Sequence, residues 1–191
     1  ALAAELARRN CQVLITGRRQ HALERVASGS DRMTRLAGDI TDPSHRAALV
    51  EGLSALPAPR AVFHGAGHFQ TGLLEHLSDD DWRRSFATNV EARWILSRDC
   101  APILEDGRVL FIGSDAGANP RVGAAAYSIA QSASETLRRA LQAEWAQRPI
   151  GVGAFKPGLV DTDMVRGFMA LSAEEFPARA VYADYVARGR V

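Results

Sequence analysis

The chain alternates between two hydrophobic periods. Five segments carry apolar residues at helical spacing or have helical composition: 1–10, 20–28, 44–56, 79–104 and 125–147. Five short apolar runs lie between or after them and predict buried strands: 11–17, 33–40, 60–67, 107–114 and 150–158. Parallel neighbours in a sheet need long crossover connections, and helices of this length supply them. We therefore expect a single α/β domain over residues 1–191, with a doubly wound parallel sheet between two helical layers.

The composition is ordinary for one globular domain, with 47% hydrophobic and 24% charged residues. The 23 basic and 22 acidic residues nearly cancel, so no excess charge favours a nucleic-acid partner. No apolar run approaches the roughly 20 residues that cross a bilayer. Cys11 and Cys100 stand among apolar neighbours and match no metal or redox spacing. These observations predict a soluble cytoplasmic protein with two buried thiols, no metal site and no membrane partner.

The residues that follow each predicted strand are unusual as a set. Ligands of doubly wound sheets bind at the carboxyl ends of the strands, so these segments are the candidate site. They are 16–19 (TGRR), 38–42 (GDITD), 64–67 (HGAG), 113–117 (GSDAG) and 156–162 (KPGLVDT). Each alone is a weak signal, because glycine after a strand is mostly turn chemistry. Together and in this order they indicate a specific kind of site.

In this order, and with Ser114 before Tyr127 and Asn89 within ATNV, the chain resembles the short-chain dehydrogenase/reductase family over nearly its whole length. The resemblance implies a Rossmann-type domain that transfers hydride between a nicotinamide dinucleotide and a small carbonyl or alcohol substrate. It implies that Tyr127 is the proton donor, that Ser114 hydrogen-bonds the substrate oxygen, and that Asn89 organises the helix and water nearby. A phenol and a hydroxyl can handle this proton without a metal.

The resemblance also implies a set of cofactor-binding residues. Asp39 and Ile40 would border the adenine, and Ala66 and Gly67 the adenosine ribose. The nicotinamide and its carboxamide would lie against residues of the last predicted strand end, namely Pro157, Gly158, Val160 and Thr162.

Each of these residues has a structural alternative. A tyrosine such as Tyr127 is often a core residue with a hydrogen-bonded tip, and a serine such as Ser114 often caps a turn. Asn89 can be a polar residue on a buried helix, and we interpret His64 and His68 as loop or pocket-wall residues. The spacing of Ser114 and Tyr127 after the right strand is what favours catalysis.

Arg18 and Arg19 decide the expected cofactor. A carboxylate at this strand end would favour NAD through the ribose hydroxyls, whereas arginine favours the 2′-phosphate of NADP. A guanidinium can bind a phosphate through two parallel hydrogen bonds, so we expect NADP rather than NAD. The alternative is a pair of exposed arginines that simply begin the next helix.

Gln131 is a departure from the family, which has lysine four residues after the tyrosine. The lysine ammonium holds the nicotinamide ribose and makes the phenol easier to ionise. The amide of Gln131 can still bind the ribose hydroxyls, but it carries no charge. The sequence therefore predicts an NADP-dependent oxidoreductase that works mainly toward the alcohol. The alternatives are a catalytically impaired NADP-binding protein acting as a sensor or interaction partner and, less consistent with the spacing, a methyltransferase-like domain.

Three further expectations depend on the resemblance. The family's central first strand and glycine-rich turn should precede residue 1, and without that strand the sheet would fall into two parts. The segment 163–186 is expected to form an apolar, mobile lid. Helices 80–100 and 125–147 carry apolar residues on more than one face, which favours a homodimer or homotetramer. These residues include Trp94, Ile95, Leu137, Leu141 and Trp145.

Overall fold

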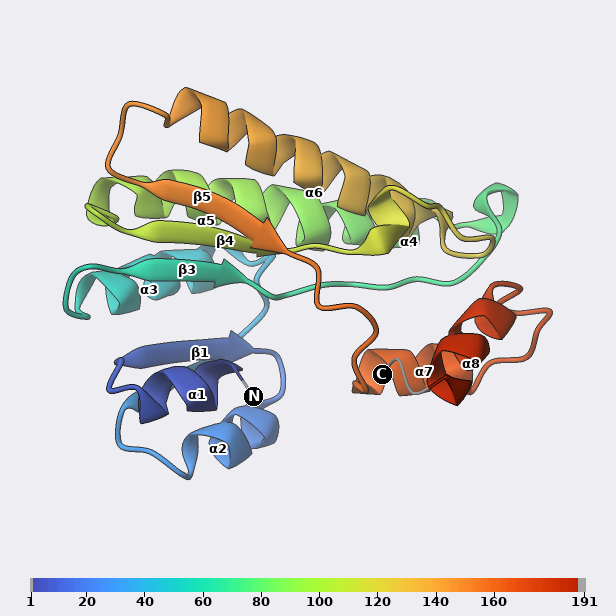
Figure 1. Cartoon of the computed structure of the whole chain (residues 1–191), viewed down its shortest axis with the longest axis horizontal. Coiled ribbons are helices and arrows are strands. Elements are labelled where there is room, and N and C mark those ends of the chain that lie inside the picture. Colours follow the sequence, from blue (N-terminus) through green and yellow to red (C-terminus); the bar gives the residue numbers. More distant parts are fainter. Residues whose placement is uncertain (1, 189–191) are drawn as a thin grey trace.

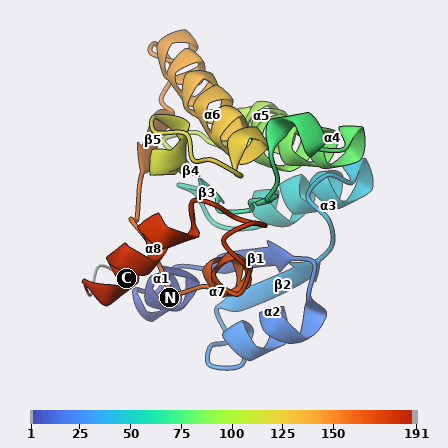
Figure 2. The same cartoon turned by 90° about the vertical axis from the view of Figure 1, so that its right-hand side faces the viewer.

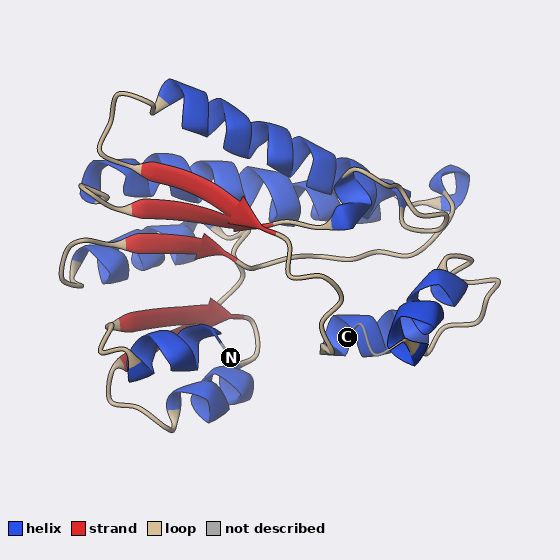
Figure 3. Cartoon of the chain, viewed as in Figure 1, coloured by secondary structure: helices blue, strands red, loops and turns tan. Residues whose placement is uncertain are grey.

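The computed structural model describes residues 2–188, which form an α/β fold of parallel strands and helices (Figures 1 and 3). The strands are β1 (Val13–Gly17), β2 (Met33–Ala37), β3 (Ala61–His64), β4 (Arg108–Ile112) and β5 (Gly151–Phe155). The helices are α1 (Leu2–Arg8), α2 (Gln20–Ala27), α3 (Pro43–Ser54), α4 (Asp79–Phe86), α5 (Ala92–Cys100), α6 (Ala125–Glu144), α7 (Asp163–Met169) and α8 (Arg179–Ala187). The predicted order of helices and strands is confirmed, with ends that differ by a few residues.

The strands form two separate parallel sheets. β1 pairs with β2, and β3, β4 and β5 pair in that order. Figure 1 shows β1 and β3 facing each other across the break. Among residues 2–188, neither of these two edges has a strand partner. The break lies where the sequence analysis expected the absent central strand, and that expectation stays a prediction.

Helices cover both sides of the strands, which confirms the three-layer α/β/α architecture. Figure 2 shows α3, α5 and α6 on one side and α1 and α2 on the other. The main core lies between β4 and the first of these layers, where Leu104 and Val109 are 0% exposed and Phe111 is 2% exposed. Each such side chain stabilises the fold by about 1.5–3 kcal/mol relative to exposure to water.

The predicted long helix 79–104 is not a uniform α-helix. Ser78 caps its start, because the Ser78 hydroxyl accepts a hydrogen bond from the Asp81 amide at 3.1 Å. A π-helical turn, Ala87–Glu91, separates α4 from α5, and a 3₁₀ turn, Ala101–Ile103, ends the segment. π-helical turns are rare and concentrate at functional sites. The hydrophobic pattern did not predict this turn.

The segment 163–186 folds into α7, α8 and their connection rather than an open loop. Phe168 and Phe176 are 5% and 0% exposed, with ring centroids 5.3 Å apart. Tyr182 of α8 packs on both, at 4.7 Å from Phe168 and 5.7 Å from Phe176. These aromatic contacts give the expected lid a small core of its own, and its mobility stays a prediction.

Of the two thiols expected to be buried, one is exposed. Cys11 is exposed because it lies in the turn between α1 and β1, where Asn10 has a positive φ of 64°. Cys100 is buried as predicted, and burial, with a smaller contribution from Asp99, raises the pKa of its thiol to about 12.

No helix within residues 2–188 is apolar over enough of its length to cross a membrane.

The residues that suggested an oligomer separate into two groups. Leu141 and Trp145 are 7% and 8% exposed and belong to the main core, so they offer no surface to a second subunit. Trp94 is 44% exposed on α5, where Arg98 lies over its ring at 5.1 Å. The homo-oligomer stays a prediction, and Trp94 is now its main support.

Candidate active site

Ser114 begins a 3₁₀ turn, Asp115–Gly117, that follows β4 and packs against α6. The Ser114 hydroxyl accepts a hydrogen bond from the Ala116 amide at 3.2 Å and so caps this turn. Gly117 lets the turn approach α6 closely, since a Cβ there would lie 3.0 Å from the Ser132 nitrogen. The Ser132 hydroxyl also donates to the Gly117 carbonyl. The second turn of α6, with Gln131 and Ser132, is thereby fixed beside the turn that Ser114 begins.

Phe69, in the loop after β3, packs against the ring of Tyr127. The two ring centroids are 4.9 Å apart, and Phe69 also contacts Phe168 and Phe176 at 5.0 and 5.8 Å. Tyr127 is half-buried. Because Phe69 contacts Tyr127 as well as Phe168 and Phe176, it joins the candidate catalytic helix to the core of the 163–186 segment. The sequence analysis missed Phe69, whose only signal was an aromatic residue soon after the strand end at 64–67.

Asn89 lies at the centre of the π-helical turn and is 0% exposed. Its side-chain oxygen accepts from the His68 amide at 3.0 Å, and its nitrogen donates to the His68 carbonyl at 2.8 Å. The Asn89 amide thus replaces a backbone partner for His68 and ties the loop after β3 to the helix. This contact fixes the loop that carries Ala66, Gly67 and Phe69.

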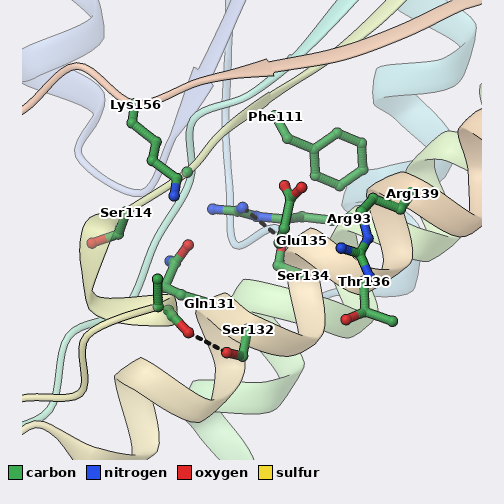
Figure 4. A pocket seen from close by; sticks show the side chains of 13 residues that line it. Arg93, Phe111, Ser114, Gln131, Ser132, Ser134, Glu135, Thr136, Arg139 and Lys156 are labelled. Carbon is green, nitrogen blue, oxygen red and sulfur yellow. Dashed lines mark hydrogen bonds between the residues drawn. The ribbon is translucent and has the colours of Figure 1, made fainter.

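A cavity of about 190 Å³ opens between α6 and the ends of β4 and β5. Ser114, Gln131, Arg93, Glu135 and Lys156 are among its lining residues, and Figure 4 shows the ends of Arg93, Gln131 and Lys156 directed toward one another. Gln131 is 4% exposed, and its side-chain oxygen has no hydrogen-bond partner among the described residues. An unpaired buried acceptor costs about 1–3 kcal/mol, so this oxygen is suited to a ligand hydroxyl.

Arg93 of α5 is the residue at this cavity that sequence reasoning missed. It is 4% exposed, and its guanidinium donates to the Ser134 hydroxyl at 2.9 Å and to the Ile112 and Ala66 carbonyls at 3.2 and 3.1 Å. All three acceptors are neutral. Burial lowers the pKa of Arg93, and a negative charge on Tyr127 would act in the opposite direction. The side chain therefore places a buried positive charge at the cavity.

His64 is a buried residue at the end of β3, so its interpretation as a loop residue is wrong. His64 is the last residue of β3, and it is 5% exposed beneath α5. Its Nε2 lies 2.8 Å from the Ser97 hydroxyl. Burial, helped by the charge of Arg93, lowers the pKa of His64 to about 3. His64 is therefore neutral at physiological pH.

The predicted arginines, Arg18 and Arg19, follow the carboxyl end of β1. Arg19 donates to Asp163 at 2.7 Å, and the two side chains are 62% and 60% exposed. Arg18 makes no side-chain hydrogen bond within residues 2–188. The pKa of Asp39 is lowered mainly by hydrogen bonds from Thr41 and to a smaller extent by the charge of Arg18. Arg18 and Asp39 therefore lie near each other, and Arg18 is the arginine free to bind a phosphate.

The remaining predicted cofactor residues lie along the same strand ends. Ile40 packs against the main core, and Gly67 lies beside Asn89, where a Cβ would be in ordinary contact with the side-chain oxygen at 3.5 Å. Gly158 has a φ of 77°, which favours glycine. Thr162 caps α7 by accepting from the Val165 amide at 3.3 Å. Pro157 and Val160 are exposed between them.

The described residues contain no group of three histidine, cysteine, aspartate or glutamate side chains that could hold a metal ion. The carboxyl ends of the strands carry instead a cavity lined by Ser114 and Gln131 after β4 and β5, and the exposed Arg18 after β1. The fold and this site define a Rossmann-type oxidoreductase.

Comparison with known proteins gives the family. The model of the short chain dehydrogenase family matches residues 1–171, so the chain belongs to this family of NAD(P)-dependent oxidoreductases. The 3-oxoacyl-[acyl-carrier-protein] reductase FabG of Pseudomonas aeruginosa is 31% identical over 174 residues, which cover 87% of this chain and 70% of that protein. The predicted family is confirmed, and the methyltransferase alternative is wrong.

Solved structures agree with this assignment. A Beutenbergia cavernae protein, provisionally assigned as an NAD(P) dependent gluconate 5-dehydrogenase and crystallised with NADP at low occupancy, is 29% identical. It superposes with a TM-score of 0.78 over 88% of this chain and 70% of its own. The KRED1-Pglu enzyme, at 24% identity, gives a TM-score of 0.86 over 100% of this chain and 82% of its own, which shows the shared fold.

Proposed function

We propose that this protein is an NADP-dependent reductase that converts a small carbonyl compound into an alcohol, with Tyr127 as proton donor. The observation that carries the proposal is that Ser114 and Gln131 line one cavity at the carboxyl ends of β4 and β5, with Tyr127 one helical turn before Gln131 on α6. Reduction of a carbonyl needs a proton at oxygen as the hydride reaches carbon, and a positioned phenol can provide it.

The residues present fit a bound dinucleotide. The buried, unpaired oxygen of Gln131 can accept a hydrogen bond from a ribose hydroxyl, and the side-chain nitrogen can donate to one. Arg18, free of side-chain hydrogen bonds, can bind the 2′-phosphate that distinguishes NADP from NAD. When bound, NADPH supplies the hydride.

The chain's own residues then account for the proton. The Ser114 hydroxyl holds the substrate oxygen near the phenol, and the Tyr127 hydroxyl gives its proton to that oxygen as the carbonyl becomes an alcohol. The phenolate left on Tyr127 regains a proton from solvent. Phe69 keeps the ring in place, and Asn89 keeps the loop of Phe69 in place. In the reverse direction the phenolate must form first, so the charge around Tyr127 sets the balance between reduction and oxidation.

The test is a measurement of NADPH oxidation by the full-length protein with a panel of aliphatic, aromatic and sugar-derived carbonyl compounds. We expect turnover with at least one of them and none in the Tyr127→Phe variant. If the wild-type protein binds NADPH but oxidises it with no member of the panel, the reductase proposal is wrong and a non-catalytic binding protein replaces it.

A further inference from the structure

His45 is a buried histidine outside the candidate catalytic residues. It lies in the first turn of α3 and is 8% exposed. Its Nε2 lies 2.7 Å from the hydroxyl of Thr16 in β1, which is hydrogen-bonding distance. Its ring also packs directly on Gly38, the residue after β2, where an added Cβ would overlap the ring atoms. One side chain of α3 therefore contacts the carboxyl ends of two strands.

These two strand ends carry the residues expected at the adenosine end of the cofactor. Arg18 follows Thr16 by two residues, and Asp39 follows Gly38 directly. The backbone also joins the two ends, since the Gly38 amide donates to the Gly17 carbonyl at 3.0 Å. Arg18 is exposed and makes no side-chain hydrogen bond within residues 2–188, so its place depends on the strand end that carries it.

We propose that His45 holds the end of β1 through Thr16 and thereby positions Arg18 for the 2′-phosphate of NADP. His45 is a positioning residue in this role, because it acts through Thr16. The inference rests on the proposed function for the choice of cofactor. It adds a residue that sets how strongly the site distinguishes NADP from NAD.

The geometry of a guanidinium–phosphate contact is the physical basis. A guanidinium binds a phosphate through two parallel hydrogen bonds, and this arrangement depends on the position and direction of the arginine. On the β2 side, the loop of Asp39 has a separate restraint, because Arg46 donates to the Ile40 carbonyl at 2.9 Å. Loss of the contact between His45 and Thr16 should therefore act mainly on the β1 side, where Arg18 lies.

The direct test compares two fragments of the cofactor by calorimetric titration of the full-length protein. The ratio of the affinities for adenosine 2′,5′-bisphosphate and ADP reports the 2′-phosphate contact without any hydride transfer. His45→Phe keeps a flat ring on Gly38 but has no polar atom for Thr16. We expect it to lower the ratio about threefold to tenfold, the factor that one hydrogen bond contributes. His45→Gln has an amide that can donate to or accept from Thr16, and should keep the ratio within about twofold.

A variant of the strand covers the case in which His45→Phe does not fold. Thr16→Val removes the same hydrogen bond from β1 and should lower the ratio as much as His45→Phe does. The double variant Thr16→Val, His45→Phe should show no further loss, because both changes remove one and the same bond. Leu53→Ala, in the last turn of α3, is the matched control. It weakens the packing of the same helix on the main core and should leave the ratio unchanged.

The outcomes separate this inference from the proposed function. A wild-type ratio in Thr16→Val overturns the role of His45, as do losses that add in the double variant. An equal fall in Leu53→Ala also overturns it, because the effect would then follow the stability of α3. If the wild-type protein does not prefer the bisphosphate, the NADP assignment and the role of His45 both fail. If the ratios behave as expected but no carbonyl compound is reduced, the reductase proposal fails while the role of His45 stands.

Discussion

Arginines occupy both ends of the candidate cofactor site in opposite environments. Arg93 is buried at the tyrosine end and hydrogen-bonds neutral oxygens, whereas Arg18 and Arg19 are exposed at the end of β1. Two nearby histidines differ in burial and in the arginines that lower their pKa values. His64, fully inside, has its pKa lowered to about 3 by burial and Arg93. His68 has its pKa lowered by partial burial, then by Arg84 and Arg18. The same residue type is therefore buried at one end of the candidate site and exposed to solvent at the other.

The largest expected effect removes the proton at the buried end. Tyr127→Phe should lower the carbonyl-reduction rate about 10²–10⁴-fold, because general acid catalysis contributes about that much. NADPH binding should stay within about twofold, since the phenyl ring keeps its packing on Phe69. Steady-state NADPH oxidation and fluorescence titration measure the two quantities. Tyr185→Phe, outside the aromatic cluster, is the control. Equal reduction rates in the Tyr127→Phe and Tyr185→Phe variants would show that Tyr127 is not the proton donor.

The next largest expected effect is a difference in the free energy of unfolding between variants of a buried and an exposed arginine. Arg93→Gln removes charge-assisted hydrogen bonds from two backbone carbonyls and a serine, and we expect a loss of about 3 kcal/mol in the free energy of unfolding. Arg19→Gln breaks an ion pair between two exposed side chains and should change the stability little. Urea unfolding of both variants at neutral pH makes the measurement. Similar losses in the two variants would contradict the difference in burial.

The next effect in size is the loss of stability that protonation of the buried His64 should cause at acid pH. Because folding lowers the pKa of His64 from 6.5 to about 3, the unfolded chain binds a proton in this range and the folded chain does not. Stability is therefore complete above pH 6.5 and falls as the pH drops through that window. This one group should cost about 2 kcal/mol between pH 7 and pH 5. Urea unfolding of the wild type and His64→Gln at both pH values tests it, and identical losses in the two proteins would rule the histidine out.

The smallest expected effect lies at the exposed end. Arg18→Ala should weaken NADPH binding about tenfold, or about 1.4 kcal/mol, and leave NADH binding unchanged. Arg19→Ala should do less, because Asp163 already pairs with Arg19 at 2.7 Å. Fluorescence titration with both cofactors compares the variants. If neither variant loses preference for NADPH, the phosphate contact is elsewhere.

The elements and the family were predictable, because both depend on local patterns. Alternating hydrophobic periods locate the five strands, and the Ser114 to Tyr127 spacing identifies the family. Arg93 was not predictable in the same way. Of its backbone acceptors, Ala66 follows β3 and Ile112 ends β4, 27 and 19 residues from Arg93 in the sequence. A hydrophobic pattern within one segment does not predict such contacts. Cys11 failed for a related reason, since apolar neighbours in sequence did not bury a residue that lies in a turn.

The π-helical turn limits how the length of this chain can vary. Ser85, Asn89, Arg93 and Ser97 recur at every fourth position, and all four are buried at 0%, 0%, 4% and 0% exposure. In a regular α-helix each residue adds about 100°, so four residues overshoot one full turn by about 40°, and three such steps by about 120°. The turn Ala87–Glu91 takes more residues per revolution and absorbs part of that drift. Deleting one residue there would rotate Arg93 away from Ala66 and turn its neighbours toward the sheet. A relative that keeps the buried arginine must therefore keep the number of residues in this turn.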